Sequence, residues 1–194
     1  KKAIALMGGG VFKLEPSDIL DGKDLSDEEV RAIFDALKVN NSLEELSLFD
    51  NSVGAEGALS ISEGLKVNES LTELNLFNNS IGNEGASSIA EALMTNNSLE
   101  KINLNNNSIG NEGASSIAGA LMVNKSLARL DLSSNSIGAE GASLISQALF
   151  VNKTLFRLYL HGNSIGDKGV LAITEALKIN TSLKVLNLND NSIR

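Results

Sequence analysis

The apolar residues of this chain recur at fixed positions every 28 residues. Each repeated unit opens with a segment such as LTELNLFNN (71–79), LEKINLNNN (99–107) or LFRLYLHGN (155–163). In the first of these, Leu74 and Leu76 alternate with polar residues, and a period of two is typical of a strand with one buried face. Each unit is therefore predicted to begin with a short, half-buried strand.

The second half of each unit has the spacing of a helix. In NEGASSIAEALMTN (83–96), the small and aliphatic residues Ala86, Ile89, Ala90 and Leu93 fall on one helical face. Asn96 follows, and Asn tolerates the left-handed backbone that ends many helices. The same helix-ending role is predicted for Asn40, Asn68, Asn124, Asn152 and Asn180.

A single strand–helix unit cannot bury its own apolar face, whereas stacked units can bury theirs against one another. Parallel strands lie about 4.8 Å apart and packed helices about 8–10 Å apart, so the stack must curve with its helices outside. The expected class is α/β, in the form of a curved solenoid.

The pattern L-x-x-L-x-L-x-x-N-x-I, with the helical half IGxEGAxxIAxAL, resembles the leucine-rich repeat of the ribonuclease-inhibitor type over about residues 20–194. Repeats of this type also occur in NOD-like immune receptors, Ran GTPase-activating proteins and, more distantly, tropomodulins. The resemblance implies a right-handed β-α superhelix with a curved parallel sheet inside and helices outside. It says much less about function, because one fold serves many functions.

The ends of the chain depart from the repeat. Residues 1–24 are interpreted as a lead-in or cap, and residues 25–194 as the array of 28-residue units. Ser26 and Glu29 have the spacing of a capping box at the start of the first helical half. The last unit stops at Arg194 without its helical half, so we expect the sequence to be a fragment of a longer array or of a multidomain protein.

Two recurring residue types have structural interpretations. The Gly-x-x-Gly pairs, such as Gly82 and Gly85, resemble a phosphate-binding loop, but they occur five times and lack the Lys-Ser/Thr of such a loop. We interpret the first Gly as a turn and the second as a point of close helix packing. An Asn ladder is predicted to bond the backbones of adjacent turns; its members are Asn51, Asn79, Asn107, Asn135, Asn163 and Asn191.

The formal net charge is −8, which argues against nucleic acid or an anionic membrane as the main partner. No cysteine is present, which excludes disulfides and thiolate metal sites and suits a reducing compartment. We therefore expect a cytoplasmic protein, with a secreted effector as the alternative. Several Asn-x-Ser/Thr sequons arise from the repeat itself, and we favour a structural role for them.

The chain offers little for catalysis. His161 is the only histidine, and nothing in YLHGNS (159–164) places a nucleophile beside it. We expect no catalytic residue, no metal, no cofactor and no small-molecule substrate.

Strand residues that alternate with the buried leucines should line the concave face of the sheet. Two aromatic residues lie in one column of this face, three basic residues in another, and Arg157, Tyr159 and His161 share one strand. Arg and Tyr are enriched among the residues that anchor interfaces. The predicted protein-binding residues are Phe49, Phe77, Lys101, Arg129, Asp131, Arg157, Tyr159 and His161.

The favoured function is a non-enzymatic module, part of a scaffold, sensor or effector, that binds a protein partner through this concave face. One alternative is a GTPase-activating protein similar to the Ran activator, because an exposed arginine can assist phosphoryl transfer. Another is a designed or consensus array, suggested by the near identity of residues 78–93 and 106–121.

Overall fold

The computed structural model describes residues 20–194, and within this range helices and strands alternate along the chain. The helices are α1 (Asp27–Leu37), α2 (Ala55–Leu65), α3 (Gly82–Leu93), α4 (Asn111–Val123), α5 (Ala139–Val151) and α6 (Gly166–Leu177). The strands are β1 (Glu45–Ser47), β2 (Glu73–Asn75), β3 (Lys101–Asn103), β4 (Arg129–Asp131), β5 (Arg157–Tyr159) and β6 (Val185–Asn187). Residues 1–19, most of the expected lead-in, lie outside the described residues.

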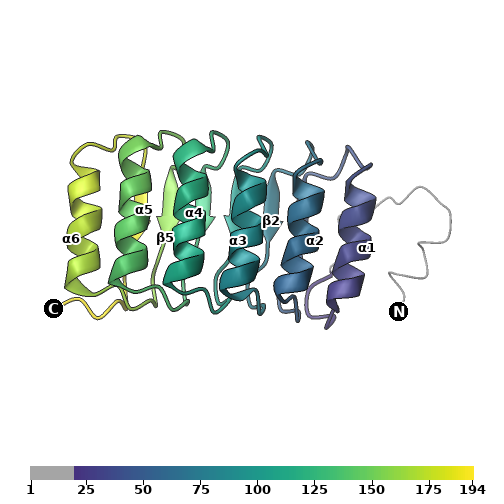
Figure 1. Ribbon diagram of the computed structural model, residues 1–194, viewed down its shortest axis with the longest axis horizontal. Helices are drawn as coiled ribbons and strands as arrows, with labels where there is room; N and C mark the ends of the chain where they lie inside the picture. Colours follow the sequence, from purple (N-terminus) through teal and green to yellow (C-terminus); the bar gives the residue numbers. More distant parts are fainter. Residues whose placement is uncertain (1–19) are drawn as a thin grey trace.

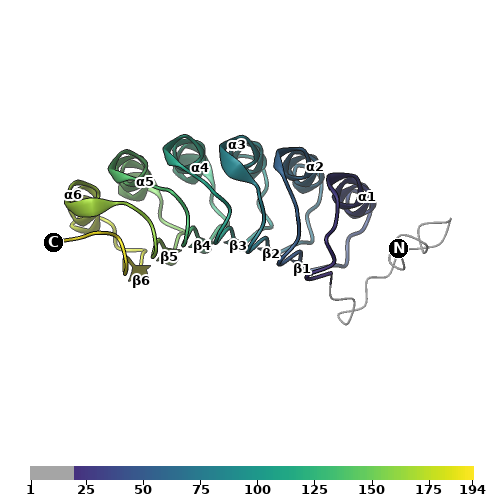
Figure 2. The same ribbon diagram turned by 90° about the horizontal axis from the view of Figure 1, so that it is seen from below.

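The strands form one parallel sheet in the order β1-β2-β3-β4-β5-β6. Each strand residue pairs with the residue 28 positions further along, as in Leu46 with Leu74 and Leu74 with Ile102. The helices run side by side in one row (Figure 1) and form the outer layer of an arc whose inner layer is the sheet (Figure 2). This arrangement confirms the predicted solenoid.

The core lies between the two layers. Leu74 and Leu76 of the strand segment and Ile89 of α3 have no exposed surface, and Leu93 is 1% exposed. Equivalent residues of the other central units are buried in the same way. Each unit thus buries its apolar stripe against its neighbours rather than against itself, as the repeat spacing requires.

The second glycine of each pair is a packing position. A Cβ atom on Gly85 would lie 2.7 Å from Cγ2 of Ile81 and 2.8 Å from Cβ of Ala58 on the preceding helix. Contacts this short are sterically forbidden, so only glycine allows α2 and α3 to approach this closely. Among the first glycines, Gly82 and Gly166 have φ values of +63° and +60°, which glycine adopts without strain.

The helix starts follow the sequence expectations. At α1, the Ser26 hydroxyl accepts a hydrogen bond from the Glu29 backbone N–H, and the Glu29 carboxylate accepts one from the Ser26 N–H. The capping box is therefore confirmed. Glu56 and Glu84 lie in the first turns of their helices, where a carboxylate complements the helix dipole.

The side chains of the Asn ladder link consecutive units. Asn135 accepts hydrogen bonds from the backbone N–H groups of Asn107 and Ile109, at 3.0 and 2.9 Å. Its amide donates to the carbonyls of Leu104 and Leu132, at 2.9 and 3.0 Å. Backbone groups that the loops cannot satisfy internally thus find partners in the neighbouring unit.

The asparagines that follow the helices behave differently from the prediction. Asn124 and Asn152 have φ values of −64° and −68° with extended backbones, so the expected left-handed helix ending is wrong. Their side chains instead form a second Asn ladder that joins each unit to the preceding one. Its buried members are Asn68, Asn96, Asn124, Asn152 and Asn180.

Candidate functional site

The concave surface consists of the strand residues that point away from the helices, together with the residues just after each strand. The strand register aligns them in columns. The first column contains Glu45, Glu73, Lys101, Arg129, Arg157 and Val185. The second contains Ser47, Asn75, Asn103, Asp131, Tyr159 and Asn187. The third follows the strands and contains Phe49, Phe77, Asn105, Ser133, His161 and Asn189.

Phe49 and Phe77 stack on each other at the β1–β2 end of the third column. Their ring centroids are 5.0 Å apart and their planes differ by 24°. Both side chains are half-buried, so each ring covers part of the other. The pair forms an aromatic platform with one exposed side.

Lys101 is paired with an acid on the neighbouring strand. Its Nζ lies 2.8 Å from a carboxylate oxygen of Glu73. The hydrogen bond that Lys101 donates to Glu73 raises the pKa of Lys101 above its usual value, and the negative charge of the same carboxylate adds to the effect. The basic stripe that the sequence suggests is therefore shortened, because one of its three charges is already matched.

Arg129 and Arg157 lie over aromatic rings. The guanidinium carbon of Arg129 is 5.3 Å from the centre of the Tyr159 ring, and that of Arg157 is 5.7 Å from the centre of the Phe156 ring. These distances are typical of cation–π contacts. Within residues 20–194 neither arginine forms an ion pair with a carboxylate. Both positive charges remain available to a partner.

Asp131 is more buried than a residue that contacts a partner is expected to be. It is only 8% exposed, and its carboxylate accepts a hydrogen bond from the Ser133 backbone N–H at 3.0 Å. Asn75 and Asn103 make the equivalent bond in their own units. Asn187 does the same after β6, so the second column stabilises the turn wherever it carries Asn or Asp, and Asp131 has this role in a largely buried position.

The third column also contains polar atoms without partners. Oδ1 of Asn105 and Oγ of Ser133 are buried and make no hydrogen bond. In the next unit, Nδ1 of His161 lies 3.5 Å from Nδ2 of Asn187. Buried polar atoms without partners are rare in folded proteins. Those of Asn105 and Ser133 lie next to the strands that carry Arg129 and Arg157.

The described residues contain no group of three or more His, Cys, Asp or Glu side chains placed to hold a metal ion. Between residues 20 and 194, no helix combines the length and apolar character that crossing a membrane requires.

Sequence reasoning missed three features of this surface: the Phe156 ring beside Arg157, and the unpartnered atoms of Asn105 and Ser133. Phe156 could have been found, since other units have Glu, Thr, Ala or Lys at its position. The lack of partners at Asn105 and Ser133 depends on distances between units, which the repeat pattern does not contain.

Comparison of the sequence with known families matches the one described as "Leucine Rich repeat" at residues 39–62, 67–90, 95–118, 123–146, 151–173 and 180–194. A comparison with curated proteins finds no match.

Among solved structures, the chain is similar to "Leiomodin-1 Actin-Binding Site 2 (ABS2)", with 32% identity and a TM-score of 0.62. The match covers 69% of this chain and 78% of that one. It is also similar to the tropomodulin C-terminal domain of Caenorhabditis elegans, with 19% identity and a TM-score of 0.62 over 78% of this chain and 93% of that one. The second likeness concerns the fold alone.

Proposed function

The chain belongs to the leucine-rich repeat family, and from this premise we propose that it is a non-enzymatic module that binds a protein partner through its concave surface. The observation that carries the proposal is the pair of unpaired arginines on β4 and β5. Arg129 and Arg157 present two adjacent positive charges on a chain whose net charge is −8.

Two further properties of the same strands support a binding role. Tyr159 supplies an aromatic ring beside Arg129, and Arg and Tyr are the residue types that most often anchor interfaces. Phe156 supplies a second ring, beside Arg157, and this ring is exposed. Repeat packing requires none of these residues, because other units place different residues at the same positions.

The strands of the concave surface are too small to form a stable interface by themselves. Within residues 20–194 the sheet has six strands of three residues each. Stable interfaces bury about 800 Å² on each partner, which is more than the short strands provide by themselves. The partner therefore also contacts the loops that follow the strands, including the Phe49–Phe77 platform and His161.

Actin is the first partner to test, because the leiomodin-1 structure with 32% identity is named as an actin-binding site. The proposal includes a cytoplasmic location, which suits a chain without cysteine. The measurement is sedimentation of the purified protein with actin filaments, compared with sedimentation alone. If the protein does not pellet with the filaments, filamentous actin is excluded as the partner, and the concave surface is then tested with another captured partner.

The concave surface is tested with the double variant Arg129→Glu and Arg157→Glu. The fold already accepts Glu in this column at Glu45 and Glu73, so the variant should remain folded. We expect partner affinity to fall about tenfold or more, since charge reversal replaces attraction by repulsion. Lys101→Gln is the matched control, because Glu73 already neutralises that charge, and it should change affinity less than about twofold. A double variant that binds as well as the parent would refute concave-face binding.

A further inference from the structure

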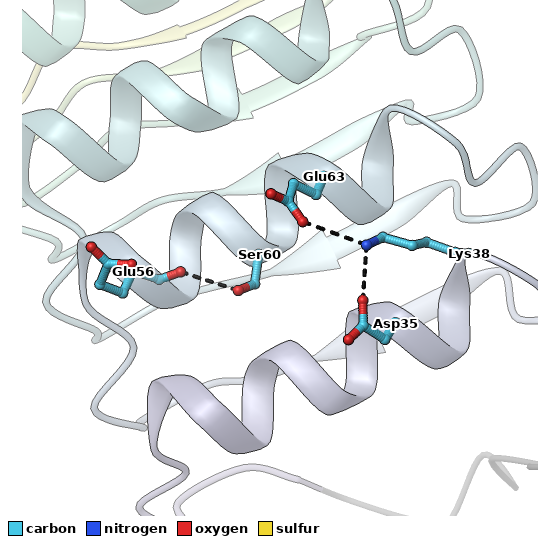
Figure 3. A network of polar contacts seen from close by, with 5 residues as sticks. All are labelled: Asp35, Lys38, Glu56, Ser60 and Glu63. Atoms are coloured by element: carbon cyan, nitrogen blue, oxygen red, sulfur yellow. Dashed lines mark hydrogen bonds and ion pairs between the residues drawn. The ribbon is translucent and has the colours of Figure 1, made fainter.

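Ion pairs connect neighbouring helices near their C-terminal ends in the first units of the array. Nζ of Lys38 lies 2.8 Å from Asp35 on its own helix and 3.5 Å from Glu63 on the next helix. Figure 3 shows Lys38 between these two carboxylates. One unit further on, Lys66 repeats the link, with its Nζ 3.2 Å from Glu91.

The following units do not form this ion pair between helices. Met94, Met122 and Phe150 stand 28 residues apart at the positions that correspond to Lys38 and Lys66. The acidic partner is lost as well, because Gly119 and Gln147 occupy the positions that correspond to Glu63 and Glu91. Lysine returns in the last helical unit as Lys178, whose Nζ lies 2.7 Å from Glu175.

The replacements leave apolar side chains in water. Met94 is 48% exposed, Met122 45% and Phe150 37%, and the adjacent Val123 and Val151 are 53% and 56% exposed. We call these five residues the Met–Phe patch. They lie on or directly after α3, α4 and α5, which stand next to one another in the row (Figure 1).

Three residues of the Met–Phe patch are specific to these units. Where the other units have an ion-paired lysine, they have Met94, Met122 and Phe150, so the repeat itself does not require Met or Phe there. Val123 and Val151 extend the patch at a position that is also apolar and exposed in other units, as Val39, Val67 and Ile179. A contiguous exposed apolar patch marks an interaction site in many soluble proteins. Methionine in particular adapts its shape to a partner's side chains.

Two lysines accompany the patch. Lys125 and Lys153 follow α4 and α5, where other units have Asn41, Glu69 or Thr181. Within residues 20–194 neither lysine pairs with a carboxylate, although Nζ of Lys153 donates a hydrogen bond to the Phe150 carbonyl at 3.3 Å. The units that carry Met122 and Phe150 thus combine an apolar surface with two unmatched positive charges.

We propose that the Met–Phe patch is a second protein-binding surface, which takes an amphipathic helix whose apolar side chains are flanked by carboxylates. Neighbouring helices of the array are about 10 Å apart, and residues i and i+7 of a helix are separated by about 10 Å along its axis. A helix lying across α3, α4 and α5 therefore places one apolar side chain on each of them.

The charges around the patch favour an acidic helix over two other occupants, an anionic lipid surface and a second copy of the chain. An anionic lipid surface is wider than the patch and would meet the field of the whole chain, whose net charge is −8, whereas a single helix contacts only the patch and the lysines beside it. In a symmetric dimer formed through the patch, Lys125 and Lys153 would face the same lysines of the second copy. An acidic amphipathic helix instead meets Lys125 and Lys153 with opposite charge.

The test uses fluorescein-labelled 18-residue helical peptides and fluorescence anisotropy. One peptide has Leu at heptad spacing with flanking Glu, a second has Lys in place of every Glu, and a third is the first with its order scrambled. We expect the acidic amphipathic peptide to bind the protein at least about tenfold more tightly than the other two.

Three double variants locate the binding. Met122→Gln with Phe150→Gln removes the apolar side chains without adding charge, and it should weaken binding of the acidic peptide at least about tenfold. Lys125→Glu with Lys153→Glu should reverse the preference between the acidic and basic peptides. Arg129→Glu with Arg157→Glu, on the opposite layer, should leave peptide affinity unchanged, which separates this surface from the concave one. Far-UV circular dichroism melts establish that each variant is folded.

Three results would overturn the proposal. The first is equal affinity for the acidic and scrambled peptides, and the second is unchanged affinity in the folded Met122→Gln, Phe150→Gln variant. The third is a dimer in sedimentation velocity that this variant abolishes, because the occupant would then be a second copy of the chain.

Discussion

The second Asn ladder should contribute strongly to stability, and Asn124 is the position at which to test this. Its Oδ1 accepts hydrogen bonds from the backbone N–H groups of Ser126 and Leu127, at 3.0 and 2.8 Å. Its amide nitrogen donates to the carbonyls of Leu93 and Asn96, at 2.7 and 3.1 Å. One side chain thus closes its own loop and also joins that loop to the preceding unit.

Replacement of Asn124 by Leu removes all of these bonds. The Leu127 N–H and the Leu93 carbonyl belong to residues that are 0% and 1% exposed, so water cannot replace the lost partner. Each buried polar group left without a partner costs about 1–3 kcal/mol. Two such groups predict a loss of about 2–6 kcal/mol in the free energy of unfolding, a large part of the stability of a typical domain.

The assay is urea denaturation followed by far-UV circular dichroism, with hydrogen exchange to locate the effect. Exchange should accelerate first in the loops around Leu93 and Leu127, because a solenoid transmits a defect through neighbouring units. The control is Asn97→Lys. Asn97 is exposed, and Lys125 and Lys153 occupy the same position in later units, so this change should alter stability by less than about 0.5 kcal/mol.

A second substitution, Asn124→Gly, separates the two explanations for these asparagines. If the residue served only to end the helix with a left-handed backbone, Gly would be neutral or stabilising. Because the backbone is extended and the side chain is bonded, we expect Gly to destabilise about as much as Leu. A loss below about 0.5 kcal/mol for either variant would refute the bonding argument.

Three further predictions follow from the described contacts. Gly169→Ala places a Cβ 2.4 Å from Cγ2 of the buried Ile165 and should lower the free energy of unfolding by about 1–3 kcal/mol in urea denaturation. In Gly119→Ala the atom nearest to the new Cβ is 3.9 Å away, so this variant should be more stable than the parent by about 0.5–1 kcal/mol. A Gly169→Ala variant more stable than Gly119→Ala would contradict the packing argument. The Ser26 N–H lowers the pKa of Glu29 from 4.5, so the bond contributes stability above that pH and loses it as the pH falls through the folded-state pKa. Melts of Glu29→Gln should therefore differ from the parent near neutral pH and converge with it in acid. Addition of the protein to a Ran-type GTPase should leave GTP hydrolysis unchanged, and an accelerated release of phosphate would favour the GTPase-activating alternative.

The repeat spacing predicted the features that every unit shares. Leu74 and Leu76 identified the strand and its buried face, and the 28-residue interval placed Arg129 and Arg157 in register on adjacent strands. These predictions succeed because the stack imposes the same environment on each unit. A position that repeats in sequence then repeats in space.

Features that depend on one particular neighbour were harder to predict. Asn124 follows a helix. Asparagine is suited both to a left-handed helix ending and to an extended loop that its side chain holds by hydrogen bonds, so the sequence could not separate the two. The burial of Asp131 also depends on side chains of the adjacent units. The Lys101–Glu73 pair could have been predicted, because residues in register on adjacent strands lie about 5 Å apart.

The two candidate surfaces overlap in the same units of the array. Arg129 and Arg157 lie on the strands β4 and β5, and Met122 and Phe150 lie on the helices α4 and α5 of the opposite layer. The buried residues between the layers are nearly the same in these units as in the others, so the differences are confined to the two outer faces. A rigid core with variable faces allows two partners to bind without competing for the same side chains. Charge reversal on one layer should then leave binding at the other unchanged, since separated sites without shared contacts behave additively.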